Sequence, residues 1–398
     1  MKFLSTYLFV FGVSSHIVVV LLLLWQPILI SKITTKFSNK YYELQKQRDY
    51  EKLTQGKTRT IREEINTTFV PWKAQSHENF NPTLTYVNEQ VYSNLTSAVK
   101  SLHDGDTLLI AAGTYRKPIV ITKNHITIKG NGHVIFEKNA AHNKGFILNQ
   151  GNNLTVENIE CRHISVRDGN GACIRQEGVD LTLNHVYFHD SQEGVLETAN
   201  VKGKITINDS RFELLGFNGQ AHGIYTNKAD LYVYQSLFIA AKDQGHAIKV
   251  RGSKLYISES IIASLSSDDS RLIDMSSGGE LVVLNSILEQ GPKSVNGQMI
   301  GYALEGFQHD YNKIELKNNL IYLDRIGENE LLATPSGSKN GLSIVRNQNT
   351  VIGKEQKTEQ NDDISFLSRG DMGLPQYPFF STAFCQRMSN CSLQLENF

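Results

Sequence analysis

The chain has 398 residues, enough for one large domain with additional segments. Its 40 basic and 40 acidic residues cancel, and no basic run is interleaved with aromatic residues. This composition argues against a general nucleic-acid-binding protein, which needs an excess of positive charge to pair with phosphates.

The N-terminal segment has the length and composition of a membrane anchor. Tyr7–Ile30 is a run of 24 residues without Asp, Glu, Lys or Arg, and it is long enough to cross a bilayer. No small-residue cleavage site follows it, so we expect residues 1–30 to stay attached as a transmembrane signal-anchor. Two features give opposite indications of the side of the membrane on which the domain lies. By the positive-inside rule, the lysines after the run favour a cytoplasmic domain. The even number of cysteines, with Cys385 close to Cys391, suits an oxidising compartment. We therefore expect the domain to be periplasmic or extracellular.

The next segments lead into a large domain. Residues 31–80 are polar and charged, which predicts a juxtamembrane stalk. Residues 94–102 have the pattern of a short amphipathic helix with Asn94 as its N-cap, suited to cover one end of a hydrophobic core. We expect the main domain over residues 81–350 and a C-terminal tail over residues 351–398 that folds back over the last coil.

A short apolar pattern recurs seven times in the main domain. The copies are LTVENIEC from Leu154, LTLNHVYF from Leu181, ITINDSRF from Ile205, LYVYQSLF from Leu231, LYISESII from Leu255, LVVLNSIL from Leu281 and IELKNNLI from Ile314. Their starts are 27, 24, 26, 24, 26 and 33 residues apart. Within each copy the apolar positions alternate, which indicates strands. A period of this length in an all-β chain predicts a right-handed, single-stranded parallel β-helix.

A second apolar column stands upstream of each copy. It consists of Ile147, Ile174, Leu196, Ile224, Ile248, Ile273 and Ile300. The residues that directly follow it are Leu148, Arg175, Glu197, Tyr225, Lys249, Asp274 and Gly301. Because successive side chains of a strand point to opposite faces, an inward apolar column puts the following column outside. Stacked positions are about 4.8 Å apart, so we expect an outward ladder of five ionisable or phenolic groups, roughly 20 Å long. That length suits a short oligosaccharide.

Two regions carry a resemblance to known proteins. Residues 105–132, GDTLLIAAGTYRKPIVITKNHITIKGNG, look like the N-terminal cap and first coil of pectin-lyase-like β-helix proteins. Within residues 222–306, the motifs HGIY, GHAIKVR, LIDMSSGGELVV and ILEQGPKSVNGQMIGYALEG resemble a bacterial group of right-handed parallel β-helix repeat proteins. The usual forms in that group are closer to GHxIKSRA and IDLPNGG, and the charged positions Lys249, Arg251 and Asp274 are retained here. The resemblance covers about residues 100–325 and implies polysaccharide handling.

The ladder offers the groups that β-elimination of a uronate chain requires. This reaction needs neutralisation of the carboxylate, a base for the C5 proton and an acid for the departing O4. Clustered cations favour a neutral lysine, so Lys249 is the predicted base, and Arg251 is the predicted carboxylate neutraliser because it can bind with two hydrogen bonds. Tyr225, with His222 or His246, would complete proton transfer.

Five further residues are predicted to contact the substrate or orient Lys249: Arg175, Glu197, Arg271, Asp274 and Glu305. Lys249 and Arg271 look similar to the lysine–arginine arrangement of β-helix alginate and chondroitin lyases, although Arg271 aligns two residues before the core column. The ladder residues can also be plain surface ion pairs.

Several alternatives stay open at this point. A C5-epimerase would use the same proton abstraction, a glycoside hydrolase would need two carboxylates, and a non-catalytic protein would only bind the polysaccharide. No cofactor is implied, although acids at coil turns (His189-Asp190, Glu193 and Asp243) are compatible with Ca²⁺. Cys161 and Cys173 are expected to be core thiols.

Overall fold

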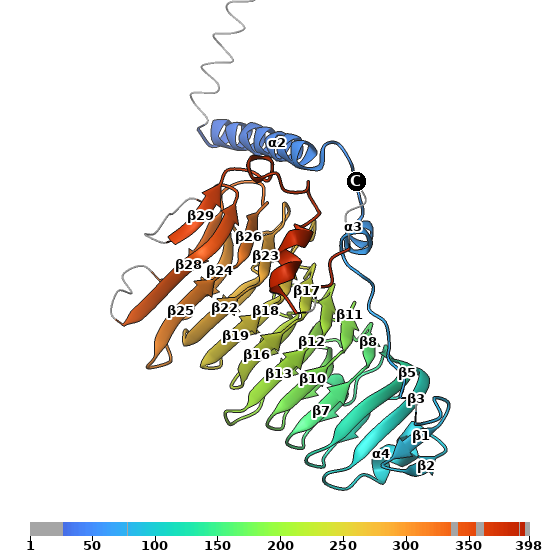
Figure 1. Ribbon diagram of the computed structural model, residues 1–398. Coiled ribbons are helices and arrows are strands. Elements are labelled where there is room, and N and C mark those ends of the chain that lie inside the picture. Colours follow the sequence, from blue (N-terminus) through green and yellow to red (C-terminus); the bar gives the residue numbers. More distant parts are fainter. Residues whose placement is uncertain (1–26, 78, 336–340, 356–361, 390, 395–398) are drawn as a thin grey trace, which may run out of the picture. The chain divides into compact units, whose positions relative to one another are not determined.

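The computed structural model describes residues 27–77, 79–335, 341–355, 362–389 and 391–394 (Figure 1). They divide into two units, Met1–Lys57 and Thr58–Phe398. In the first unit the described part contains the helix α2 (Pro27–Thr54). The predicted anchor, residues 1–30, lies outside the described residues except for 27–30. Among the residues that are described, no helix is both long enough and apolar enough to span a membrane.

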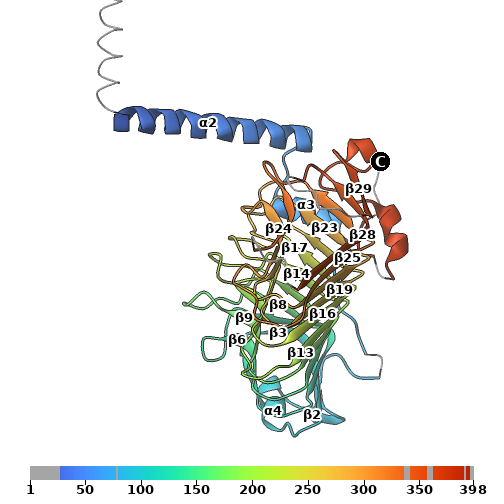
Figure 2. The same cartoon turned by 90° about the vertical axis from the view of Figure 1, so that its left-hand side faces the viewer.

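The second unit is a parallel β-helix, as predicted, built from two long sheets (Figures 1 and 2). One sheet has nine strands: β4 (Ile119–Ile121), β6 (Gly145–Asn149), β9 (Ala172–Gln176), β12 (Glu193–Glu197), β15 (Ile224–Thr226), β18 (Ile248–Val250), β21 (Ile273–Met275), β24 (Gln298–Tyr302) and β27 (Glu330–Ala333). The strands of this sheet pair in parallel from one coil to the next. Each coil therefore contributes one strand to it.

The other sheet contains 20 strands, and most coils contribute two of them. The longer series is β3 (Thr107–Tyr115), β5 (Thr127–Glu137), β7 (Leu154–Glu157), β10 (Leu181–Asn184), β13 (Lys204–Asn208), β16 (Asp230–Tyr234), β19 (Lys254–Ser258), β22 (Glu280–Leu284), β25 (Asn312–Lys317) and β28 (Leu342–Ile352). The shorter series is β8 (Glu160–Arg162), β11 (Tyr187–His189), β14 (Arg211–Glu213), β17 (Leu237–Ile239), β20 (Ile261–Ala263), β23 (Ile287–Gln290) and β26 (Leu320–Leu323). The remaining strands are β1 (Thr85–Val87), β2 (Gln90–Tyr92) and β29 (Asp362–Phe366).

The small polar residue of the repeat forms a ladder inside the bend between the two series. The backbone N–H of Ser210 donates to Ser236 Oγ at 3.0 Å, and the N–H of Ser236 donates to Ser260 Oγ at 3.1 Å. The same contact continues from Ser260 to Ser286. These hydroxyls satisfy backbone groups that the tight bend would leave unpaired in the interior, which explains why the repeat keeps a polar residue between apolar ones.

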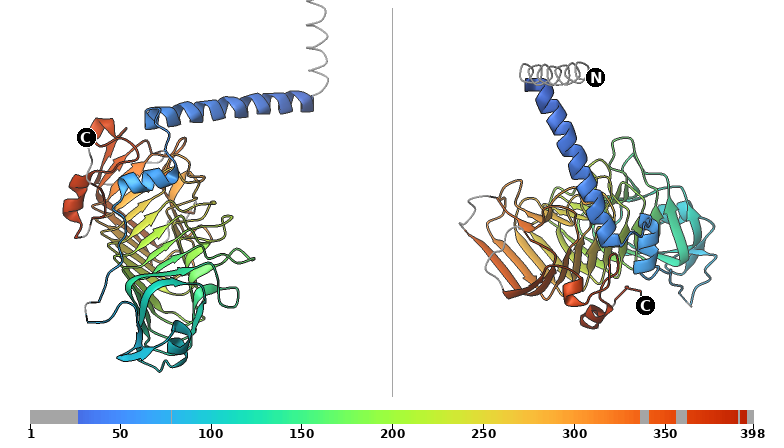
Figure 3. Two further views of the ribbon diagram at one scale, coloured as in Figure 1. Left: turned by 90° about the vertical axis from the view of Figure 1, so that its right-hand side faces the viewer. Right: turned by 90° about the horizontal axis from the view of Figure 1, so that it is seen from above.

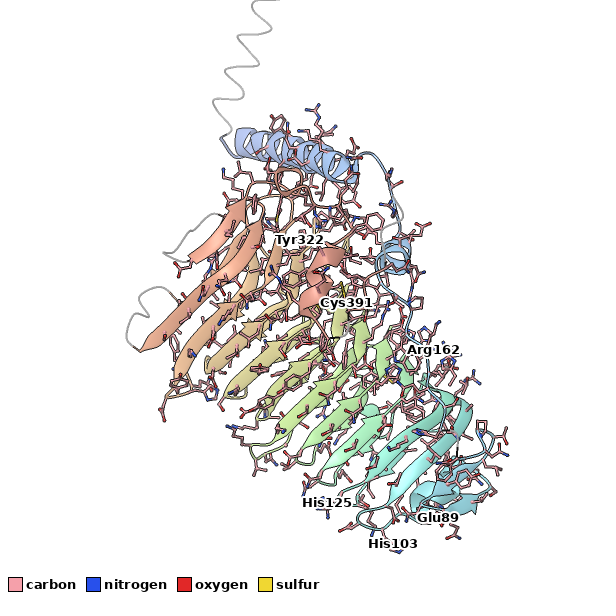
Figure 4. All side chains as sticks on the ribbon, in the orientation of Figure 1. Glu89, His103, His125, Arg162, Tyr322 and Cys391 are labelled. Atoms are coloured by element: carbon pink, nitrogen blue, oxygen red, sulfur yellow. A yellow bond between two sulfur atoms is a disulfide. The ribbon has the colours of Figure 1, made fainter. Side chains whose placement is uncertain are left out.

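A helix covers the end of the core at β1 and β2, as the sequence predicts. The helix α4 (Leu95–Lys100) begins after Asn94, whose side chain accepts a hydrogen bond from the Ser97 N–H at 2.9 Å. Leu95 and Ala98 are buried in the same apolar cluster as the core columns. Figure 3 shows this end of the β-helix from the side, and Figure 4 marks it by Glu89, His103 and His125.

A second apolar cluster lies outside the coils, over the shorter strand series. The helix α3 (Ile61–Thr68), which begins with a Thr60–Glu63 capping box, contributes Ile65 to it. The C-terminal segment contributes Phe380 and Leu393, and its 3₁₀ turns are η1 (Gly370–Met372) and η2 (Thr382–Arg387). Tyr322 on β26 belongs to the same cluster, and Figure 4 labels Tyr322 and Cys391 on this side. The C-terminal segment thus covers several coils instead of the last one alone, and the compact unit begins at Thr58, before the predicted boundary at residue 81.

Both cysteine pairs form disulfides. Cys385 is bonded to Cys391, as their proximity in the sequence suggests. The expectation that Cys161 and Cys173 are free thiols is wrong, since these two cysteines are bonded to each other with their Cα atoms 5.9 Å apart. They lie on β8 and β9, where the chain turns from one sheet to the other, and both side chains point into the core.

Candidate functional site

The outer face of the nine-stranded sheet carries a polar cluster across β15, β18 and β21. Strand pairing places Tyr225 beside Lys249 and Lys249 beside Asp274, one coil apart in each case. The core column of Ile224, Ile248 and Ile273 is fully buried beneath them. The predicted ladder is therefore real over these three coils, because the alternation of a strand forces the residue after each inward isoleucine to face outward.

The Lys249 ammonium lies between two carboxylates. Its Nζ is 3.3 Å from Asp274 Oδ2 and 3.2 Å from Glu305 Oε1. Asp274 also accepts a hydrogen bond from Ser276 Oγ at 3.0 Å. The predicted role of Lys249 as a base requires cations as its nearest neighbours. Lys249 Nζ instead contacts two carboxylates, so this geometry suits Lys249 to bind a negatively charged group.

The guanidinium group of Arg251 binds the carboxylate of Glu305 as well. Arg251 Nε donates to Glu305 Oε2 at 3.0 Å, and Nη2 donates to Oε1 at 2.8 Å and to Oε2 at 2.7 Å. The guanidinium carbon lies 5.1 Å from the centre of the Tyr225 ring, and Lys249 Nζ lies 5.9 Å from the same point. Two cations thus converge above one aromatic ring and bind one carboxylate.

His222 and His246 are stacked and buried beside this group. Their rings are 4.8 Å apart and nearly parallel. The N–H of His246 donates to His222 Nδ1 at 3.1 Å, and the N–H of Arg271 donates to His246 Nδ1 at 3.2 Å. Because each Nδ1 is an acceptor, the proton of each neutral ring is on Nε2, and His246 Nε2 lies 3.3 Å from Asp274 Oδ2.

Burial determines the charge state of these histidines. It lowers the pKa of His246 to about 4, with Lys249 and Arg271 adding to the effect and Asp274 opposing it. Burial, followed by the charges of His246 and Lys249, also lowers the pKa of His222 well below its usual value. Both rings are neutral near pH 7, and neither offers a free nitrogen lone pair. They are therefore suited to hold Asp274 and the backbone in place and unsuited to act as bases.

Arg271 belongs to the column of the two histidines. Its position two residues before Ile273 matches that of His222 before Ile224 and of His246 before Ile248. Its Nη2 donates to Gln298 Oε1 at 2.6 Å, and its side chain crosses Gly301, where a Cβ would stand 3.0 Å from Arg271 Cδ. Arg271 is thus next to the cluster, although it is not in the Lys249 column.

Two predicted substrate-binding residues are placed elsewhere. Val195, and not Leu196, pairs with Ile174 and Ile224, so the predicted register is wrong by one residue in this coil. Glu197 therefore points inward and is buried, with its carboxylate accepting hydrogen bonds from the backbone N–H groups of Ala199, Asn227, Lys228 and Ala229. Its role is to hold a turn. Leu196 occupies the outward position and separates Arg175 from Tyr225.

The acids considered for calcium do not come together. Asp190 is bound by Arg62 and by His189, and burial raises the pKa of Glu193 well above its usual value. Within the described ranges, no group of three or more His, Cys, Asp or Glu side chains is arranged to hold a metal ion.

Three residues near the cluster were not assigned to it from the sequence. Ser276 and Gln298 contact predicted site residues, and Glu193, which is buried, aligns one coil before His222. Alignment of the residues two positions before the core column would have found Gln298, whereas the register error at Leu196 puts Gly194 in the place of Glu193. Ser276 follows Asp274 by two residues, so both side chains lie on the same side of β21.

Some solved structures are similar to this chain at low sequence identity. No protein-family model matches the sequence, and no curated protein matches it. Among solved structures, a PL6 alginate lyase in complex with a trisaccharide has 13% identity and a TM-score of 0.36, and the match covers 66% of this chain and 70% of that one. A second alginate lyase, in complex with G6, has 15% identity and a TM-score of 0.34, with 64% and 60% covered. A pectin methylesterase in complex with a hexasaccharide has 12% identity and a TM-score of 0.36, with 77% and 96% covered. Likeness at this level does not carry an activity from one chain to another.

Proposed function

We propose that this protein acts on an acidic, uronate-containing polysaccharide and cleaves it by β-elimination. The observation that carries the proposal is the binding of one carboxylate, that of Glu305, by Arg251 and Lys249 together. A uronate side group presents the same carboxylate chemistry. The flat outer face of a parallel sheet also gives room for an extended chain to lie along it.

Each step of the elimination has a candidate group. Arg251 and Lys249 would neutralise the uronate carboxylate, which makes the C5 proton easier to remove. A base takes this proton, the C5–H electron pair forms the C4=C5 double bond, and the C4–O4 bond breaks as O4 receives a proton. Because both histidines lack a free lone pair, we assign both proton transfers to Tyr225, whose ring lies against both cations. As the phenolate, its oxygen would take the C5 proton, and the hydroxyl so formed would donate that proton to O4.

Hydrolysis has less support from the geometry. A glycoside hydrolase places two carboxyl groups on either side of the scissile bond. Asp274 and Glu305 instead bind the same ammonium, and Asp274 is buried. An epimerase would share the proton abstraction, so the products have to distinguish it from a lyase.

The test uses the purified full-length protein with a panel of acidic polysaccharides, following ultraviolet absorbance and chain length. A lyase shortens the chain and produces an unsaturated sugar that absorbs in the ultraviolet. An epimerase changes the sugar composition without either signal. Binding without turnover would support a non-catalytic protein and would overturn the elimination proposal.

Substitutions of Lys249 and Tyr225 test the role proposed for each residue. Lys249→Met should lose both turnover and affinity, while Tyr225→Phe should lose turnover and keep affinity. Removing Lys249 leaves Asp274 without its cation, so Lys249→Arg serves as the charge-preserving control, and thermal melting checks the fold of each variant. Normal turnover by Lys249→Met would rule out the proposed role of this residue.

Location outside the cytoplasm and attachment through residues 1–30 remain part of the proposal. The pairing of all four cysteines supports an oxidising compartment.

A further inference from the structure

Two carboxylates, those of Asp274 and Glu305, contact Lys249, and the Glu305 side chain is the more exposed of the two. Its side chain is 41% exposed, whereas that of Asp274 is 7% exposed. Asp274 is fixed on β21 and held by Ser276 and His246, while Glu305 lies between β24 and β25 and is held by Lys249 and Arg251. The two carboxylates therefore differ in how easily they can leave the ammonium.

The backbone around Glu305 is anchored, so the side chain can move without the loop. The Glu305 N–H donates to the Ser276 carbonyl at 3.0 Å, and the Gln308 N–H donates to the Ser277 carbonyl at 2.9 Å. Gly306, which follows directly, has a φ of 99° that completes the turn. A rotation of the Glu305 side chain alone would release both cations.

Electrostatics keep Glu305 charged while it is bound. Burial alone would raise its pKa, but the hydrogen bond from Arg251 and the charge of Lys249 lower it below the usual value. The Glu305 carboxylate thus makes the contacts expected of a substrate carboxylate.

We propose that Glu305 is an internal occupant of the carboxylate subsite, and that the uronate carboxylate of an acidic glycan displaces it on binding. This inference rests on the proposed function. Exposed ion pairs contribute little to stability, so a second carboxylate can replace Glu305 at small cost. The exchange would favour acidic over neutral glycans, because a neutral sugar has no group to replace the glutamate.

Two exposed apolar side chains stand beside Glu305. Leu304 is 39% exposed and Phe307 is 40% exposed. Leu304 directly precedes Glu305 in the chain and Phe307 follows it by two residues, so both belong to the loop whose glutamate occupies the subsite.

The test compares Glu305→Gln with wild type by calorimetric titration of oligogalacturonate, oligomannuronate and oligoguluronate. The variant should bind the acidic oligomer up to about fivefold more tightly, the factor that corresponds to removing a competing exposed ion pair. Glu280→Gln is the matched control, since Glu280 forms a similar pair with Lys254 at 2.7 Å on the other sheet. The Glu280→Gln variant should bind the acidic oligomer with the same affinity as wild type. Equal or weaker binding by Glu305→Gln, when wild type binds, would overturn the inference and leave the proposed function intact.

A second readout does not depend on any glycan. Acylation of Lys249 by a water-soluble N-hydroxysuccinimide ester, followed by peptide mass spectrometry, should be faster in Glu305→Gln than in wild type. In Glu280→Gln, Lys254 should react faster and Lys249 should not change. An unchanged rate at Lys249 would show that Glu305 does not restrict access. Faster acylation with no glycan binding in either protein would instead count against the proposed function.

Discussion

The stacked histidines make the stability of the protein depend on pH. His246 is buried, and its native pKa of about 4 lies below the value of about 6.5 expected in the unfolded chain. As the pH falls from 7 towards 4, the unfolded state therefore binds more protons than the native state, and the free energy of unfolding decreases. Between pH 7 and pH 5, His246 accounts for a decrease of about 2 kcal/mol in the free energy of unfolding.

His246→Gln tests this relation. Urea unfolding at pH 7 and pH 5 gives the decrease in the free energy of unfolding between these two pH values. This decrease should be about 2 kcal/mol smaller in the variant than in wild type. His103→Gln is the control, because the His103 side chain is 84% exposed. Identical pH dependence in wild type and His246→Gln would show that the pKa of this ring does not differ between the native and the unfolded state.

Single residues also mark the limit of what the sequence could predict. Val195 and Leu196 are both apolar, so alternation alone could not decide which of them faces inward, and the choice reverses the side of Glu197. The contact of Glu305 with Lys249 joins residues 56 positions apart and depends on a loop after β24. Tyr225, Lys249 and Asp274 were found because strand alternation and the repeat fix their positions, and His222 and His246 were found because they stand in the motifs just before β15 and β18.

At the scale of elements, the inward columns hold the coils together. Ile248 on β18 stacks between Ile224 and Ile273 and is fully buried. Ile248→Ala should lower the free energy of unfolding by about 2–5 kcal/mol, because the lost side chain leaves a cavity between coils. Val201→Ala, at a position that is 58% exposed, should change it by less than about 0.5 kcal/mol. Chemical denaturation of both variants gives the comparison, and a small effect at Ile248 would contradict the stacked core.

Regular elements were predictable where the repeat is regular. The period fixed the strands, and Asn94 with the apolar spacing of the following residues fixed α4. The packing of α3 was missed, and the C-terminal segment was predicted to cover the last coil alone, because these segments lie outside the repeat and their partners are far away in the chain. An isolated apolar residue such as Phe69 does not reveal which surface it covers.

At the scale of the whole molecule, the remaining question is where the β-helix works. The 24-residue run of Tyr7–Ile30 without Asp, Glu, Lys or Arg predicts attachment to a membrane, and the two disulfides favour the oxidising side of it. Deleting residues 1–30 should move the protein from the membrane fraction to the soluble fraction after ultracentrifugation. Thermal unfolding should not change, because the compact unit begins at Thr58. A full-length protein that is already found in the soluble fraction, or whose N-terminus maps near residue 30 by mass spectrometry, would contradict the anchor. The β-helix would then reach its polysaccharide by diffusion instead of from a fixed position at a membrane surface.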